Sequence, residues 1–137
     1  MISFHTEDIV FDLPNIKTST DWLVNSIINE QKEVGNIDYI FCSDQYLHKI
    51  NLQYLNHDTF TDIVTFNYCE NNEVNADIFI SIDRVKENAI KYNKSFINEL
   101  HRVMIHGILH LVGYNDKTKP EQDLMTTKED FYLSLLF

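Results

Sequence analysis

The stretch SFINELHRVMIHGILHLVGYND, residues 95–116, decides the fold that the sequence predicts. Its apolar side chains recur around much of the circumference of a helix, which indicates a helix buried at the centre of the molecule. Gly113 is typical of the residue that follows the last turn of a helix. Two histidines, His106 and His110, lie four positions apart before this glycine, and Asp116 follows it by three positions.

The two histidines face the same way, because residues four apart on a helix lie one turn above each other. Gly113 lets the chain leave the helix sharply, so residues 114–116 can fold back and bring Asp116 to the same point. Two imidazoles and one carboxylate would leave one position open for water, as catalytic zinc sites do. This donor set favours zinc, with nickel and manganese as alternatives.

The ordinary alternative is a pair of histidines held only by hydrogen bonds, but two imidazoles in an apolar helix each need a polar partner. Position 107 separates the pattern from that of a zinc peptidase. Peptidases with the sequence HExxH use the glutamate after the first histidine as general base. Gly107 removes that group, so peptide hydrolysis is disfavoured.

Two apolar runs upstream of the central helix predict a β-hairpin. Residues 62–68, DIVTFNY, and residues 76–82, ADIFISI, are rich in strand-forming residues, and turn residues separate them. Residues 2–5 and 37–42 predict two further strands. Helices are expected over residues 19–33, 44–54, 83–92, 93 or 95 to 112, and 120–135.

Particular residues are expected to open or end these helices. Gly35 is expected to stop the first helix, and Ser43 and Asp83 to cap the second and third. The order β-α-β-α-β-β-α-α-α, with a hairpin inside it, predicts an α+β fold. We expect a small mixed β-sheet of about four strands with helices packed on it, and the metal-binding residues on the central buried helix.

The composition fits one globular domain over residues 1–137. Hydrophobic residues make up 44% of the chain, with three glycines and two prolines, and a chain of this length buries roughly two-thirds of its unfolded surface. No apolar run reaches the ~18 residues of a membrane span, and the first residues lack the pattern of a signal peptide. We therefore expect a cytoplasmic protein without membrane contact, whose Cys42 and Cys69 are free thiols.

The net charge of −10 is unevenly distributed. Residues 1–83 carry 14 acidic side chains against 3 basic ones, whereas residues 84–137 carry 7 against 8. Lys94 and Arg102 lie in this more basic part and are candidates for contact with phosphate groups. The alternative is that they belong to solvated helix faces.

Three further side chains near the histidines need an interpretation. Glu99 precedes His106 by two helical turns, so it could orient a ligand imidazole or place its charge at the start of the helix. His101 lies about 140° around the helix from His106 and is not counted as a ligand. Asp62 is a candidate supporting base, although a role in closing the turn before its strand is the simpler alternative.

The run HGILHLVGYND resembles the HGxLHLxGYDH signature of the YbeY family, metal-dependent single-strand endoribonucleases tied to ribosomal RNA maturation. TDIVTF (61–66) is similar to the family's TDVLSF strand, and ADIFIS (76–81) to its GDIxIS strand. Glu99, Met125 and Glu129 also stand at positions that match family members, and the resemblance spans roughly residues 37–130.

The resemblance implies one zinc ion per chain, held by His106, His110 and Asp116. It also implies cleavage of single-stranded RNA, ribosomal RNA or ribosomal particles as partners, and a role in ribosome biogenesis. RNA suits a site without the peptidase glutamate, because its own 2′-hydroxyl can attack and a metal-bound hydroxide can serve as base.

Two positions depart from the family pattern. Asp116 stands where the family has a third histidine, and its charge should make a metal-bound water less acidic, which predicts a more alkaline activity optimum. Leu55 stands where the family has an arginine implicated in handling RNA, and a leucine does not replace an arginine on phosphate.

Two other functions remain open at the level of the sequence. One is a non-catalytic ribosome-assembly factor in which zinc only stabilises the fold. The other is a hydrolase that acts on a different phosphate or amide substrate. A fourth protein ligand that closes the metal site, for which His57 is the one candidate, would favour structural zinc.

Overall fold

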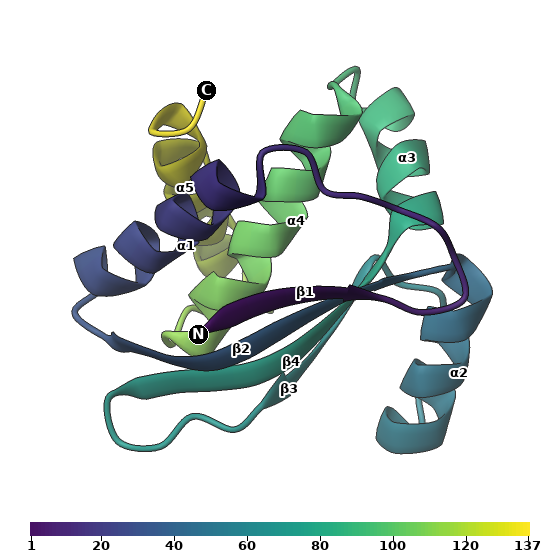
Figure 1. Cartoon of the computed structure of the whole chain (residues 1–137), viewed down its shortest axis with the longest axis horizontal. Coiled ribbons are helices and arrows are strands. Elements are labelled where there is room, and N and C mark those ends of the chain that lie inside the picture. Colours follow the sequence, from purple (N-terminus) through teal and green to yellow (C-terminus); the bar gives the residue numbers. More distant parts are fainter.

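A four-stranded sheet with strand order β1-β2-β4-β3 forms the base of the fold in the computed structural model, which describes residues 1–137 (Figure 1). Strands β1 (Ile2–Thr6), β2 (Glu33–Cys42) and β4 (Glu73–Ser81) run parallel, and β3 (Ile63–Asn67) pairs antiparallel with β4. The predicted hairpin and the mixed sheet of four strands are confirmed. β3 lies at the edge of the sheet, so one side of it is free to line a site.

Five helices complete the α+β fold, and their order along the chain is the predicted one. They are α1 (Ile16–Asn29), α2 (Asp44–Leu55), α3 (Ile82–Lys91), α4 (Phe96–Leu111) and α5 (Lys119–Ser134). Figure 1 shows α1, α4 and α5 together on one side of the sheet and α2 on the other. Side chains alternate between the two faces of a strand. Ile63 accordingly belongs to the main core, whereas its neighbour Val64 packs with Leu47 of α2.

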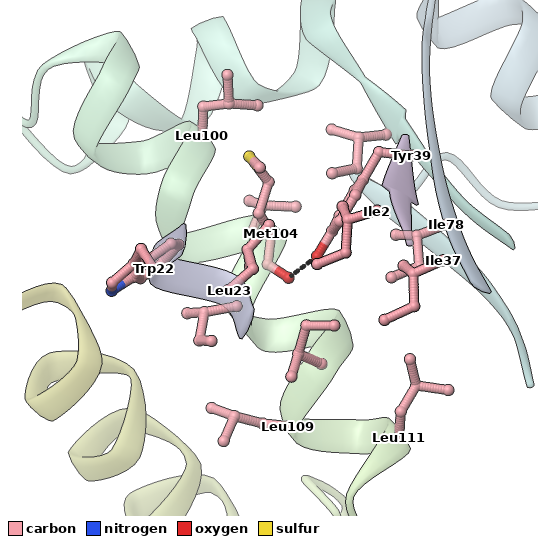
Figure 2. Packing of buried hydrophobic residues seen from close by; sticks show 14 of the residues in the cluster. Ile2, Trp22, Leu23, Ile37, Tyr39, Ile78, Leu100, Met104, Leu109 and Leu111 are labelled. Atoms are coloured by element: carbon pink, nitrogen blue, oxygen red, sulfur yellow. Dashed lines mark hydrogen bonds between the residues drawn. The ribbon is translucent and has the colours of Figure 1, made fainter. Parts of the chain in front are cut away.

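Helix α4 is the buried central helix that the sequence predicts. Leu100, Met104 and Leu109 are among its fully buried side chains and pack into the main hydrophobic core (Figure 2). The Tyr39 hydroxyl donates a hydrogen bond of 2.9 Å to the carbonyl oxygen of Met104, which ties the sheet to the middle of the helix. The burial of this stretch fixes the direction in which its polar histidines point.

Gly107 brings α4 close to the sheet. A Cβ atom at this position would lie 3.0 Å from Cδ1 of Ile63 in β3 and 3.5 Å from Ile78 in β4. Position 107 therefore faces packed aliphatic side chains, which explains why a small residue stands where a peptidase would carry its glutamate.

Some predicted boundaries are wrong. The first helix ends at Asn29 instead of 33, because Gln31 adopts a left-handed backbone conformation and β2 begins at Glu33. Gly35 does not stop this helix: it is a buried residue of β2, where a side chain would collide with Asn75.

The caps of the later helices also differ in part from the predicted ones. Ser81 caps α3, since its hydroxyl accepts from the backbone of Arg84, whereas the predicted cap, Asp83, accepts from the backbone N–H of Asp44. The caps of the neighbouring helices are Ser43 for α2, as predicted, Ser95 for α4, one of the two predicted residues, and Thr118 for α5.

Both cysteines are free thiols, as the sequence predicts. None of the five helices has the length and apolarity that crossing a membrane requires.

Candidate metal centre and cleft

Three side chains with metal-binding atoms converge at the end of α4. His106 Nε2 and His110 Nε2 lie 3.0 Å apart, and Asp116 Oδ2 lies 3.4 Å from the first and 3.3 Å from the second. All three residues are half-buried, and together they form a group that could hold a metal ion. The spacing predicted from the sequence therefore brings the three candidate ligands together.

The other ring nitrogen of each histidine has a fixed acceptor. His106 Nδ1 donates to Glu129 Oε2 at 2.7 Å, and His110 Nδ1 donates to the carbonyl oxygen of Tyr114 at 2.9 Å. A neutral imidazole that donates through Nδ1 presents an unprotonated Nε2. In this tautomer two nitrogen lone pairs and a carboxylate oxygen point at the same place, which is the arrangement that a metal ion requires.

A cation suits this arrangement of acceptors. Ligand atoms at the corners of a tetrahedron, each about 2.1 Å from a metal, are about 3.4 Å apart. The three separations of 3.0, 3.3 and 3.4 Å lie near this value. The residues present therefore fit a tetrahedral metal with three protein ligands.

The turn after α4 places Asp116. Gly113 has a φ of 114°, and its N–H donates to the carbonyl of His110 at 3.1 Å. The N–H of Tyr114 donates to the carbonyl of Leu109 at 2.9 Å. A residue with a Cβ is strained at this φ, so the glycine is needed for the chain to reverse toward the histidines.

Glu129 of α5 links His106 of α4 to a partly buried ion pair with Arg102. Its Oε1 accepts from Arg102 Nη1 at 2.8 Å while its Oε2 accepts from His106. Arg102 also pairs with Asp130. Glu129 is buried and the carboxylate is thereby held in one orientation, which in turn orients the His106 ring.

Sequence reasoning noted Glu129 only as a family match and missed this contact. Nothing in the spacing of two residues 23 positions apart on different helices shows that they meet. The sequence suggested that Glu99 could orient a ligand imidazole. Glu99 forms no hydrogen bond with His106, and its side chain lines a second, smaller cavity.

Charge and burial oppose each other at His106. Burial lowers the pKa of its imidazole, but the hydrogen bond and charge of Glu129, aided by Asp116 and Asp62, outweigh it and raise the pKa. Burial also raises the pKa of Asp62, and the nearby His106 opposes that shift. The centre is therefore a region of negative potential that attracts positive charge.

A cleft of about 700 Å³ opens beside the metal centre. The loop after α2, the edge strand β3 and the end of α4 line it. Side chains that can form hydrogen bonds dominate the lining near the strand: Thr59, Thr61, Asp62, Thr65 and Asn67. Lys117 is the one lysine or arginine that lines the cleft, and it was not among the residues predicted to contact phosphate.

Leu55 and His57 both line this cleft. Leu55 is the last residue of α2 and is 40% exposed, so the position that carries an arginine in the family does face the cleft. His57 is exposed and does not belong to the group of three metal-binding residues. The group therefore offers three candidate protein ligands.

The remaining candidates lie at different places. Arg102 faces the second cavity and is paired with Glu129 and Asp130. Lys94 is exposed in the turn before α4. His101 is buried away from the centre, where its ring nitrogens bond to the Ser19 hydroxyl and the Ile97 carbonyl.

The fold and the site define a class of protein: a small α+β fold with a group of three side chains that could hold a metal ion beside a polar cleft. A family model described as "Endoribonuclease YbeY" matches residues 1–136, and the chain belongs to this family. The resemblance seen in the sequence is therefore confirmed.

Two curated relatives and one solved structure illustrate the match. The Endoribonuclease YbeY of Flavobacterium johnsoniae is 53% identical over 130 residues, 95% of this chain and 93% of the relative. That of Amoebophilus asiaticus is 51% identical over 133 residues, 96% and 90% respectively. The solution structure of TM1509 from Thermotoga maritima has a TM-score of 0.70 at 28% identity, covering 99% of this chain and 89% of that one.

Proposed function

We propose that this chain is a zinc-dependent endoribonuclease that cleaves single-stranded RNA and acts in the cytoplasm on ribosomal RNA during ribosome biogenesis. The observation that carries the proposal is the convergence of three acceptor atoms, from His106, His110 and Asp116, at the side of an open polar cleft. Membership in the endoribonuclease family supports RNA over other phosphate or amide substrates.

Zinc is the metal that this donor set favours, because two imidazole nitrogens and one carboxylate oxygen in a tetrahedral arrangement are typical of catalytic zinc. When bound, zinc supplies a Lewis acid for a phosphoryl oxygen and lowers the pKa of a coordinated water. The chain's own contribution is to hold the three ligands in place. Glu129 and the Tyr114 carbonyl accept from the two Nδ1 atoms, which orients both rings and directs both Nε2 atoms at one point, where a metal would take the place of a proton.

Asp62 is the side chain best placed to accept a proton from the attacking hydroxyl group. It lines the cleft and is close enough to His106 for their charges to interact. Burial raises the pKa of its carboxyl group toward the range in which a carboxylate is an effective base. Gly107 faces the sheet and has no side chain, so this position cannot supply the general base that the glutamate of a zinc peptidase provides.

The cleft suits the backbone of a single strand. Threonine hydroxyls and the Asn67 amide can bond to ribose and phosphate oxygens without reading a sequence. Lys117 is its one lysine or arginine, and the whole chain carries a net charge of −10. We therefore expect weak, salt-sensitive binding of free RNA, with a ribosomal particle or protein presenting the natural substrate.

The alternative of a non-catalytic assembly factor with structural zinc gains no support from the site. A structural zinc site has four protein ligands, whereas this group has three, and His57 stays outside it.

Removal of the metal separates the two functions. The protein is treated with a zinc chelator, and the folded fraction by circular dichroism and the cleavage of a labelled single-stranded RNA are followed together. We expect cleavage to stop while the protein stays folded, and activity to return with one equivalent of zinc. Loss of the fold together with the metal would favour structural zinc.

A further inference from the structure

A second cavity, of about 300 Å³, adjoins the cleft at His106. Asp62, His106 and Asp116 line both cavities, so the metal centre lies where the two meet. The remaining lining comes from α4 and α5, with Glu99, Arg102 and Glu129 as its polar side chains. Its volume is at the lower end of the range of small-molecule sites.

Glu99 lines this cavity without a partner. Its side chain is 5% exposed, and it makes no hydrogen bond or ion pair. No buried side-chain oxygen of the protein lacks a partner, so the oxygens of Glu99 are not sealed off but face the space of the cavity, where a ligand can reach them. Burial raises the pKa of this carboxyl group, while Arg102 opposes the shift. A ligand that donates hydrogen bonds would stabilise the ionised form of Glu99.

The other charged groups of the cavity argue against a second metal ion. Both oxygens of Glu129 are already engaged, one by Arg102 and one by His106. The Arg102 guanidinium lines the same cavity and repels a cation. Asp116 already belongs to the group of three candidate zinc ligands, and the other two carboxylates, Asp62 and Glu99, do not form a metal-binding group with a third residue. A neutral ligand that donates hydrogen bonds therefore suits this cavity better than a metal ion does.

We propose that this cavity binds the nucleobase next to the scissile phosphate, and that Glu99 selects guanine there. The inference rests on the proposed cleavage of single-stranded RNA. Unpaired bases are read on their Watson–Crick edges by polar side chains. The edge of guanine carries two neighbouring donors, the imino N–H and the amino group, which match the two oxygens of a carboxylate. Uracil presents carbonyl oxygens on both sides of its single N–H, and a carboxylate repels them.

Two neighbours of Glu99 complete a base site. Arg102 is held by Glu129 and Asp130, so its planar guanidinium group is available for stacking but not for pairing with a phosphate. Val103 adds the one apolar side chain of the lining.

Binding of short RNA analogues to the zinc-loaded protein tests the inference without relying on cleavage. Three labelled 2′-O-methyl hexamers lack the attacking hydroxyl: uridine throughout, or with one central guanosine, or with one central inosine, which lacks the amino group. By fluorescence anisotropy we expect the guanosine hexamer to bind about 10-fold or more tightly than the uridine hexamer, and inosine to lie between them.

The Glu99→Gln variant should lower the affinity for the guanosine hexamer without lowering the affinity for the uridine hexamer. The guanosine hexamer should bind more weakly, while the uridine hexamer should bind equally well or better because a negative charge near the phosphates is gone. A merely structural role would move both affinities together. Glu33→Gln, which removes the same charge from an exposed position at the start of β2, should leave the ratio of affinities unchanged.

Several results would overturn the inference. They are equal binding of the three hexamers by the wild type, an unchanged guanosine-to-uridine ratio in Glu99→Gln, binding of none of the hexamers, or a second zinc ion that Glu99→Gln abolishes. Cleavage of RNA without a guanine preference would leave the proposed function intact and remove only this inference. A guanine preference in binding without any cleavage would support the cavity's role and count against the nuclease.

Discussion

Glu129 Oε2 accepts a hydrogen bond of 2.7 Å from Nδ1 of His106. A helix that is remote in sequence therefore orients one of the three candidate metal ligands. The same carboxylate, which is buried, accepts from the partly exposed Arg102 of α4. A carboxylate that holds a ligand histidine fixes its tautomer and raises its basicity. The metal centre therefore depends on the docking of α5 as well as on the helix that carries both histidines.

We expect Glu129→Gln to weaken zinc binding by about 10- to 100-fold, the range seen when such a supporting group is removed. Glutamine keeps the size of the side chain but lacks the charge that stabilises the imidazole. Competition with a chromophoric chelator gives the affinity directly. Asp130→Asn is the matched control, since Asp130 also pairs with Arg102 but does not contact His106. Equal zinc affinities in the two variants would contradict the orienting role.

Replacement of Leu55 by arginine is expected to strengthen the binding of RNA. Because Leu55 faces the cleft, Leu55→Arg should strengthen binding of single-stranded RNA and make it more salt-dependent, by about 0.7 in the slope of log affinity against log salt. Leu52→Arg is the control: it adds the same charge to the same helix at a residue that is 45% exposed but outside the cleft lining. Identical slopes for the two variants would mean that the cleft does not hold the RNA backbone.

The charge of Asp116 should set the pH range of activity. An anionic ligand offsets part of the charge of the metal, so the wild type should reach its full rate at higher pH than Asp116→His. Rates of RNA cleavage measured across pH at saturating zinc provide the comparison. Superimposable profiles would contradict this effect of the carboxylate.

His101 should make stability fall in mild acid. Burial lowers its pKa below the ordinary value of 6.5, so the unfolded chain binds a proton that the folded chain excludes. The stability that neutral His101 contributes is therefore complete above about pH 6.5 and is lost as the pH falls below it.

Urea unfolding of wild type and His101→Gln at several pH values tests this prediction. The difference between their slopes of unfolding free energy against pH isolates His101 from the other titrating groups. We expect the variant to lose less stability on acidification than the wild type. His57→Gln, at an exposed position, should follow the wild-type slope, and a His101→Gln curve parallel to the wild type would count against the prediction.

The sequence was sufficient for the features that depend on local pattern. The order of the elements, the hairpin and the buried α4 follow from hydrophobic periodicity, and the convergence of His106, His110 and Asp116 follows from helical spacing and one glycine. The first helix was placed too far along the chain because Gln31, a residue without a preference for the left-handed conformation, ends it. Tertiary pairing of β2 decides that boundary.

The parts of the site that come from different elements were not predictable from spacing. Glu129 and Arg102 belong to separate helices, and their pairing requires the packing of α4 on α5. The position of Glu99 on the correct stripe of α4 suggested contact with His106, yet its side chain lies in the second cavity. Only the three-dimensional arrangement shows that one carboxylate is engaged and the other has no partner.

The most direct test of the central claim is the cleavage of a labelled single-stranded RNA by the wild type beside His110→Ala, purified identically, with zinc content measured on the same samples. Removal of one of three ligands should abolish tight zinc binding. The account predicts one zinc per wild-type chain and zinc-restored cleavage, with neither in the variant. Equal cleavage by both proteins, or a wild type that holds one zinc and does not cut RNA, would contradict it.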